Sequence, residues 1–388
     1  MKRTASVDIF RALTMLMMLF VNDYAGMSGL PHWMHHAKPT EDMLGFSDLV
    51  FPAFLFCVGL SIPLAIANRF NKGDSQIHVL GHILLRTLAL LVMGIFAMNF
   101  RGVEGGLSRP VFTLLAVAGF FLIWNAYPRR DDGRFPVWVR LLQGAGVILL
   151  VGLVIYKDLH GMPFRHGWWG ILGLIGWAYL PCALAFLFLR GDFKKVTGFW
   201  LVTLLLCILN ASPAIPKEYA SRAIMLGFWP GGWTHPAICA TGMFATMLML
   251  RCQPKSRRLY ALLGALALAL LILGLISHRF WIISKILATP TWAFYCLALF
   301  VLVLGILHWI ADERGLTAWA KPVSPAGTAT LTCYTIPMLW YAVQELLGLQ
   351  WPAVLTDGLP GLLKALAYSF VIIGLTWLFG KIHLKLKL

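Results

Sequence analysis

Uninterrupted apolar stretches of 18 or more residues recur along the whole chain, and they constrain its fold more than any other feature. A helix of that length crosses about 30 Å of hydrocarbon. The stretches are continuous rather than alternating, which disfavours strands, and an open sheet would leave unsatisfied backbone groups in lipid. The composition agrees, with 59% hydrophobic and only 12% charged residues among 388. The sequence therefore predicts an all-α polytopic membrane protein.

The apolar stretches divide into about twelve predicted transmembrane helices, within a range of 10–12, when one crossing takes roughly 20 residues. The chain 1–388 is accordingly predicted to form a single transmembrane domain. The predicted helices are centred within 7–25, 48–68, 79–99, 110–127, 137–157, 168–189, 194–211, 236–251, 259–277, 290–309, 327–347 and 361–380.

Lysine and arginine predict the orientation, because cytoplasmic loops carry an excess of both. If the N-terminus is cytoplasmic, about two thirds of the basic residues face the cytoplasm and the C-terminus lies there too. Topology and anionic lipid headgroups then explain the net charge of +16, so no nucleic-acid partner is predicted. The cytoplasmic segments are "MKR", "NRFNKG", "YPRRDDGR", "RGDFKK", "RCQPKSRR", "ADERG" and "KIHLKLKL".

The start of the chain and the cysteines bear on compartment and metal chemistry. The first apolar segment lacks a small-residue cleavage site and is predicted to be a signal anchor. The seven cysteines lie in or beside predicted spans without a CxxC pair, so neither a disulfide framework nor a metal site is predicted. Nothing else in the sequence indicates a eukaryotic secretory protein, and a bacterial inner (cytoplasmic) membrane is favoured.

Charged and amide side chains near the span ends are the candidate functional residues, because burying such groups in a membrane is costly. Asp8 and Arg11 share one helix face and are predicted to pair, either to orient the first helix or to form a wall for an anionic cofactor. Asn22 and Asp23 end the first apolar run, where they either cap the helix or line a cavity. Asp48 directly precedes an apolar run and is predicted to be a helix N-cap.

Two adjacent histidines, His35 and His36, lie in the first predicted loop on the far side of the membrane. A loop histidine is usually only solvated, yet imidazole is the side chain best matched to proton transfer near neutral pH. Their spacing alone does not distinguish one histidine from the other.

Several motifs, taken together and in order, resemble the heparan-α-glucosaminide N-acetyltransferase family of transmembrane acyltransferases. The strongest are "SVDIFRALTMLMMLFVNDYAG", "WMHHA" and "DLVFPAFLFCVGLSIPLAI", all in the N-terminal quarter. Weaker matches follow at 168–180, 281–300 and 324–336. The resemblance covers most of the chain, and the helices around 110–157 look like an insertion relative to the lysosomal enzyme.

The resemblance implies transfer of an acetyl group from cytoplasmic acetyl-CoA to a sugar amine or hydroxyl on the far side of the membrane. In this register the family's active-site histidine falls on His36, because Ala37 follows it, and its asparagine falls on Asn22. His36 would act as a general base or form an acyl-imidazole, and direct transfer is slightly favoured. Asn22 would hold the thioester carbonyl.

Further candidates concern the two substrates. No Walker-type glycine loop is present for the donor's phosphates, so cations must hold them. Lys285 is read equally well as a snorkelling lysine at the membrane interface. The candidates for binding acetyl-CoA are Arg11, Asp8, Arg86 and Lys285, and those for binding the acceptor are His35, Asp23 and Asp48.

Departures from the family pattern concern the acceptor. The stretch "AKPTEDMLGFS" is longer than in many members, and "YTIPMLW" lacks the family's His-Glu. An amino sugar, a muropeptide or another envelope glycan is therefore predicted rather than heparan sulfate. A secondary transporter of a sugar or small solute is the competing class, and a structural or assembly factor is a third. Polar residues cluster at span ends, which favours the enzyme. A homodimer is compatible with the resemblance, since dimers occur in relatives.

Overall fold

The computed structural model describes residues 4–129, 134–167, 169–212, 232–252 and 256–388. Parts of three predicted cytoplasmic segments, at 1–3, 130–133 and 253–255, lie outside these ranges. Within the described ranges all regular structure is helical, apart from one isolated bridge between Asn125 and Leu386. The predicted all-α class is confirmed.

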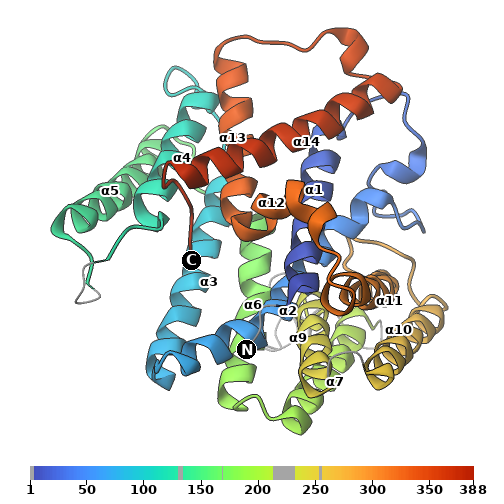
Figure 1. The fold of residues 1–388 in the computed structure, drawn as a ribbon. Coiled ribbons are helices and arrows are strands. Elements are labelled where there is room, and N and C mark those ends of the chain that lie inside the picture. Colours follow the sequence, from blue (N-terminus) through green and yellow to red (C-terminus); the bar gives the residue numbers. More distant parts are fainter. Residues whose placement is uncertain (1–3, 130–133, 168, 213–231, 253–255) are drawn as a thin grey trace. The chain divides into compact units, whose positions relative to one another are not determined.

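Each of the twelve predicted spans coincides with an α-helix (Figure 1). The helices are α1 (Ala5–Tyr24), α2 (Val50–Asn71), α3 (Gln76–Met98), α4 (Arg109–Trp124), α5 (Val137–Leu159), α6 (Gly170–Phe188), α7 (Phe193–Ala211), α9 (Thr234–Arg251), α10 (Arg257–Ser277), α11 (Pro290–Leu307), α13 (Thr330–Leu346) and α14 (Gly358–Lys381). Shorter elements are η1 (His32–Met34), η2 (Phe46–Leu49), η3 (His308–Glu313), η4 (Ala318–Val323), α12 (Ser324–Thr328) and η5 (Ala353–Leu355).

Nine helices among the described residues are long and apolar enough to cross a membrane, which confirms a polytopic membrane protein. In one of them, η2 runs directly into α2 and the span extends over Phe46–Asn71. The other three, α4, α9 and α13, fall below this criterion, with 16, 18 and 17 residues. For these three the prediction of a membrane crossing stays a prediction.

The helices belong to two compact units, each described here by itself. Unit 1 comprises Met1–Thr14, Pro31–Leu91 and Ile171–Ala320, and unit 2 comprises Met15–Leu30, Val92–Gly170 and Lys321–Leu388. The single domain over 1–388, and the insertion around 110–157, stay predictions.

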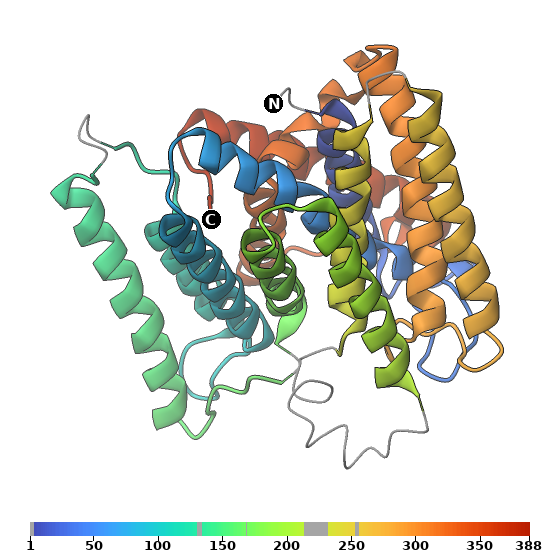
Figure 2. The same ribbon diagram turned by 90° about the horizontal axis from the view of Figure 1, so that it is seen from below.

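In unit 1 the closest helix pair is α2 with α9, and glycines permit the approach. A side chain at Gly59 would collide with the carbonyl oxygen of Cys239, and one at Gly242 with the carbonyl oxygen of Phe56. Small residues at an interface let two backbones approach, as is usual where lipid removes a hydrophobic driving force between helices. Helices α10 and α11 lie side by side next to this pair (Figure 2).

In unit 2, α4 packs against both α5 and α13, and α14 contacts α12 and α13. Gly119 of α4 faces Leu150 of α5, where a larger side chain would collide with it. Beyond α14 the chain returns to the end of α4, where the Ala126 N–H donates to the carbonyl of Lys385 at 2.8 Å. The end of α1 also belongs to this unit and is tied to α13 and α14 by side-chain contacts described below.

Candidate active site

The loop between α1 and α2 folds back on itself in unit 1. The Ser47 hydroxyl donates to the carbonyl of Met34 at 2.6 Å, and the Ala37 N–H donates to Oδ2 of Asp48 at 3.1 Å. Gly45 lies at the crossing point, where any side chain would collide with the carbonyl of His35. The fold-back therefore brings the strand-like segment after η1 against η2.

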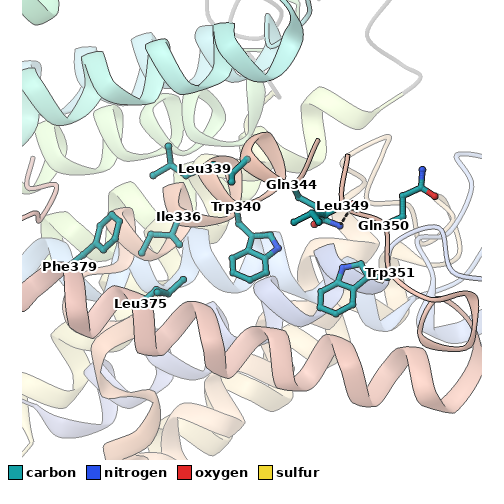
Figure 3. Close-up of a pocket in the computed structure, with 10 residues that line it drawn as sticks. Ile336, Leu339, Trp340, Gln344, Leu349, Gln350, Trp351, Leu375 and Phe379 are labelled. Carbon is teal, nitrogen blue, oxygen red and sulfur yellow. Dashed lines mark hydrogen bonds between the residues drawn. The ribbon is translucent and has the colours of Figure 1, made fainter. Parts of the chain in front are cut away.

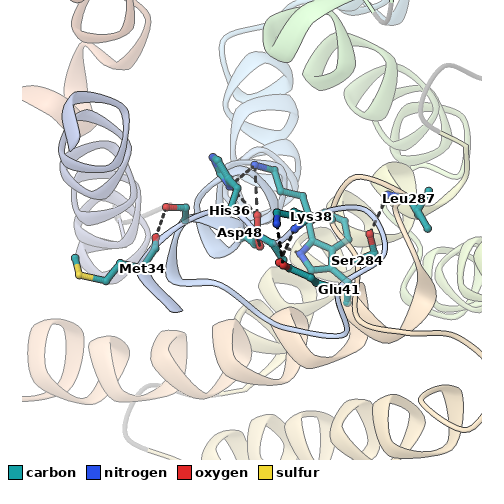
Figure 4. A network of polar contacts seen from close by, with 11 residues as sticks. Met34, His36, Lys38, Glu41, Asp48, Ser284 and Leu287 are labelled. Carbon is teal, nitrogen blue, oxygen red and sulfur yellow. Dashed lines mark hydrogen bonds and ion pairs between the residues drawn. The ribbon is translucent and has the colours of Figure 1, made fainter. Parts of the chain in front are cut away.

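This fold-back places His36 on Asp48 (Figure 4). Nδ1 of His36 lies 2.7 Å from Oδ1 of Asp48, whose side chain is 2% exposed. Asp48 also receives the Ala37 N–H, and a carboxylate only accepts hydrogen bonds, so Nδ1 of His36 carries the proton. The Nε2 lone pair is then free for chemistry: no residue of the described ranges bonds it, and the side chain is 45% exposed.

A lysine from the loop between α10 and α11 completes this group. Nζ of Lys285 lies 3.2 Å from Nδ1 of His36 and 3.8 Å from Oδ1 of Asp48. Because Nδ1 already donates its proton to Asp48, the ammonium group of Lys285 is held by the carboxylate and not by the imidazole. Burial lowers the pKa of Lys285, and the Asp48 carboxylate acts in the opposite direction.

Further contacts within unit 1 hold the two loops together. The Ile283 N–H donates to Oδ1 of Asp42 at 2.8 Å, and Nε2 of His278 lies 2.8 Å from Oδ2. These donors, led by the Ile283 N–H, lower the pKa of Asp42. The indole N–H of the fully buried Trp292 donates to the backbone carbonyl of Asp48 at 3.2 Å. Lys285 is therefore held near His36 by anchors on both sides of it in the sequence.

The predicted N-cap role of Asp48 is wrong. Asp48 lies within η2, the residue before α2 is Leu49, and no side chain caps α2 there. The carboxylate is taken instead by His36 and by the Ala37 N–H, because the fold-back brings these donors into its buried surroundings. The ring of His35 makes no hydrogen bond within the described ranges, so only one of the two histidines is held in a polar network.

The predicted cytoplasmic-side cations also lie in unit 1. Asp8 and Arg11 pair as predicted, at 3.5 Å, and Nη2 of Arg11 donates to Oγ of Ser61 on α2 at 2.6 Å. The guanidinium of Arg86 lies 4.8 Å from the ring centroid of Tyr179, and its buried Nε has no hydrogen-bond partner in the described part of the chain. Arg86 is thus a partly desolvated cation with a donor to spare.

Asn22 and Asp23 belong to unit 2, where they have different surroundings. Asp23 is committed to structure: its side chain is 3% exposed, Nζ of Lys364 lies 2.6 Å from Oδ2, and the Tyr341 hydroxyl donates to Oδ1 at 2.7 Å. Asn22 lines a cavity of about 240 Å³ together with residues of α4 and α13. The alternative that Asn22 lines a cavity is therefore confirmed, whereas its catalytic role stays a prediction.

A larger cavity of about 490 Å³ in unit 2 lies between α13 and α14 (Figure 3). Its walls are mostly apolar, with Ile336 and Leu339 facing Leu375 and Phe379. It holds no charged side chain and none of the predicted site residues. Size alone therefore does not identify the site, since acyl transfer needs a base and groups that stabilise charge.

Comparison with known proteins gives relatives with a stated activity. Residues 3–190 match a family model described as "Domain of unknown function (DUF5009)". The heparan-alpha-glucosaminide N-acetyltransferase of Mus musculus is 36% identical over 198 residues, which cover 45% of this chain and 29% of the mouse protein. The protein of the same name in Homo sapiens is 38% identical over 185 residues, covering 42% of this chain and 27% of the human protein. The chain is related to this acetyltransferase family.

The family resemblance predicted from the motifs is thus confirmed, and the aligned region spans less than a third of the length of these relatives. The motifs singled out His36 but missed its partner. The signal was present in the family pattern itself, where Asp48 recurs at a fixed place after the histidine, but a buried acid before an apolar helix reads locally as a cap. The approach of Lys285, 249 residues away from His36, has no local signal.

Proposed function

We propose that this chain is a membrane acyltransferase that moves an acetyl group from acetyl-CoA to an amine or hydroxyl of an amino sugar or glycan. The observation that carries the proposal is the hydrogen bond of 2.7 Å between Nδ1 of the half-exposed His36 and the buried carboxylate of Asp48. An imidazole held in this tautomer presents a basic nitrogen to a substrate, and the carboxylate stabilises the imidazolium that forms when it accepts a proton.

In direct transfer the acceptor amine attacks the thioester carbonyl while Nε2 of His36 takes its proton. The new C–N bond forms, the C–S bond breaks, and the proton passes from the imidazolium to the departing thiolate of CoA. General base catalysis of this kind contributes about 10²- to 10⁴-fold. The Asp48 carboxylate keeps Nδ1 protonated throughout, so only Nε2 exchanges a proton with substrate.

A two-step route uses the same nitrogen. Nε2 of His36 attacks the thioester, CoA leaves, and the acetyl-imidazole passes its acetyl group to the acceptor. Asp48 supports both routes equally, because it holds the ring and stabilises positive charge on it in either case. Direct transfer is favoured, since the His36 ring is 45% exposed and an acyl-imidazole there would meet water.

Cations would serve the donor at two places. The Lys285 ammonium lies beside the reactive histidine and suits the negative charge that develops on the thioester oxygen. Arg86 and Arg11 are candidates for the phosphates of CoA, and the spare buried Nε donor of Arg86 supports this role. Asn22 is proposed to hold a substrate carbonyl or hydroxyl from its cavity.

The positive-inside pattern places the loops that carry His36 and Lys285 on one and the same side, opposite the cytoplasm. The acceptor is therefore proposed to bind outside, at a bacterial inner membrane with both chain ends in the cytoplasm, while the nucleotide part of acetyl-CoA stays inside. An envelope amino sugar fits such a site.

The experiment compares two neighbouring histidines. Purified wild type, His36→Ala and His35→Ala are incubated with radiolabelled acetyl-CoA and a panel of glucosamine derivatives. We expect transfer by wild type and by His35→Ala, and a loss of at least about 100-fold in kcat for His36→Ala. Full activity of His36→Ala would overturn the catalytic assignment. Absence of acetyl-CoA binding by wild type would overturn the enzyme itself and favour a transporter or a structural factor.

A further inference from the structure

The cavity that contains Asn22 is built from three helix ends of unit 2. Asn22 comes from the end of α1, Arg109 and Thr113 from the first turns of α4, and Tyr334 and Glu345 from α13. The positive-inside pattern predicts that the end of α1, the start of α4 and the end of α13 all lie on the far side of the membrane. The cavity thus belongs to the side where the acceptor is proposed to bind.

The polar groups of this cavity match a sugar. The amide of Asn22, the carboxylate of Glu345 and the hydroxyl of Tyr334 make no hydrogen bond to any side chain within the described ranges, so they remain available for ligand hydroxyls. Phe100 and Pro110 add apolar walls. Its volume of about 240 Å³ is below the range of about 300–1,000 Å³ for pockets of drug-sized ligands, which suits a single sugar ring.

Arg109 gives the cavity a cationic side. Its Nε lies 3.8 Å from Oε2 of Glu345, and the side chains are 65% and 47% exposed. A pair this long and this exposed contributes little by itself. The terminal nitrogens of Arg109 have no partner in the part of the chain that the structure describes, so the guanidinium can bind an anion with two parallel hydrogen bonds.

We propose that this cavity is the acceptor subsite and that Arg109 selects an amino sugar with an anionic substituent on its ring. Glu345 and Asn22 receive the sugar hydroxyls, and Glu345 also keeps the guanidinium of Arg109 over the cavity. This inference rests on the proposed acetyl transfer for the identity of its ligand. Carboxylate and phosphate both fit a guanidinium, so the shared chemistry is an oxyanion, and the experiment distinguishes the two sources.

The test measures binding and transfer separately. Acceptors are glucosamine, its 3-O-lactyl ether, which adds a carboxylate, and glucosamine 6-phosphate. Binding is measured by calorimetry without acetyl-CoA, and transfer is measured as kcat/KM for each acceptor. The variants are Arg109→Gln, Arg109→Lys and Glu345→Gln. Matched controls are Arg165→Gln and Glu104→Gln, which change the same charges at exposed sites of unit 2 outside the cavity.

We expect wild type to prefer at least one anionic acceptor over glucosamine by about tenfold, at the lower end for a hydrogen bond to a charged group. Arg109→Gln should abolish this preference while kcat/KM for glucosamine and KM for acetyl-CoA stay unchanged, and Arg109→Lys should restore part of it. Glu345→Gln should weaken all three acceptors, and the controls none.

Equal binding of the three acceptors by wild type would overturn the inference, as would a preference that survives Arg109→Gln. A rise of KM for acetyl-CoA in Arg109→Gln would also overturn it, because the residue would then serve the donor. Anion-selective binding that is lost in Arg109→Gln, without any acetyl transfer by wild type, would uphold the subsite and refute the proposed function. Transfer without anion preference would do the reverse.

Discussion

Replacing Asp48 by asparagine tests the proposed site most directly, because the two shapes are nearly equal and only the hydrogen-bonding pattern changes. In the native protein both carboxylate oxygens accept: Oδ1 from Nδ1 of His36 at 2.7 Å and Oδ2 from the Ala37 N–H at 3.1 Å. An asparagine has one oxygen and one NH₂ group. One of the two donors must therefore lose its acceptor.

The structure decides which donor loses it. If the NH₂ group faced the buried Ala37 N–H, two donors would oppose each other, at a cost of about 1–3 kcal/mol for the unsatisfied group. If it faces His36, the imidazole can respond by moving its proton from Nδ1 to Nε2 and accepting the NH₂ group. The second arrangement satisfies every group, so Asp48→Asn should fold with His36 in the wrong tautomer.

A histidine with its proton on Nε2 has no lone pair for the substrate. We expect kcat to fall by about 10²- to 10⁴-fold, the full contribution of a general base. This equals about 2.7–5.4 kcal/mol in the activation free energy. The variant should stay within about 1 kcal/mol of wild type in unfolding free energy, since the amide oxygen still receives the Ala37 N–H.

The assay follows release of the CoA thiol by purified protein in detergent, with ¹⁵N NMR of the imidazole to report its tautomer. Because His36 and Asp48 act as one unit, the double variant Asp48→Asn with His36→Ala should be no slower than His36→Ala alone. Retention of kcat within threefold by folded Asp48→Asn would refute the reasoning, as would additive losses in the double variant.

Three further results are expected. For Lys285→Met we expect about a tenfold lower kcat and for Lys285→Arg a smaller loss; because burial lowers the pKa of Lys285, wild-type activity should fall at a pH below the usual lysine value of about 10.4, and this alkaline limb should move up in Lys285→Arg. The lowered pKa of Asp42 means that its stabilising contacts are complete above the usual aspartate value of about 3.9 and are lost as pH falls through the lower value of the folded protein; Asp42→Asn should therefore lower the thermal midpoint near neutrality and remove part of its acid dependence, and an unchanged pH profile would contradict this. Gly45→Ala should destabilise by about 1–3 kcal/mol and lower kcat, because its methyl group would collide with the His35 carbonyl, whereas Gly144→Ala, which meets nothing, should do neither.

The loop after His36 shows a limit of reading residues locally. Its acidic residues Glu41 and Asp42 suggest contacts with an acceptor, yet both are already used within the protein. Glu41 accepts the backbone N–H of Lys38 at 2.9 Å, which lowers its pKa, and Asp42 accepts the Ile283 N–H. These carboxylates hold loops in place, and the acceptor preference is proposed to come from Arg109 instead.

The sequence by itself determined the helices and the identity of one catalytic candidate. A backbone in lipid must satisfy its own hydrogen bonds, so a long apolar run has one solution, and all twelve runs are helices. The motif around Ala37 likewise distinguished His36 from His35 without any structure. Both inferences rest on information carried within about 20 neighbouring residues.

Only the tertiary structure decided what surrounds that histidine. Asp48 is either a cap or a partner depending on whether the loop folds back, and the fold-back depends on the collision-free space at Gly45 and on the Ser47 contact with Met34. Lys285 reaches the site because separate loops are joined through Asp42. Such contacts depend on loop closure between distant segments, which no local periodicity encodes, and they set the tautomer and charge on which the chemistry depends.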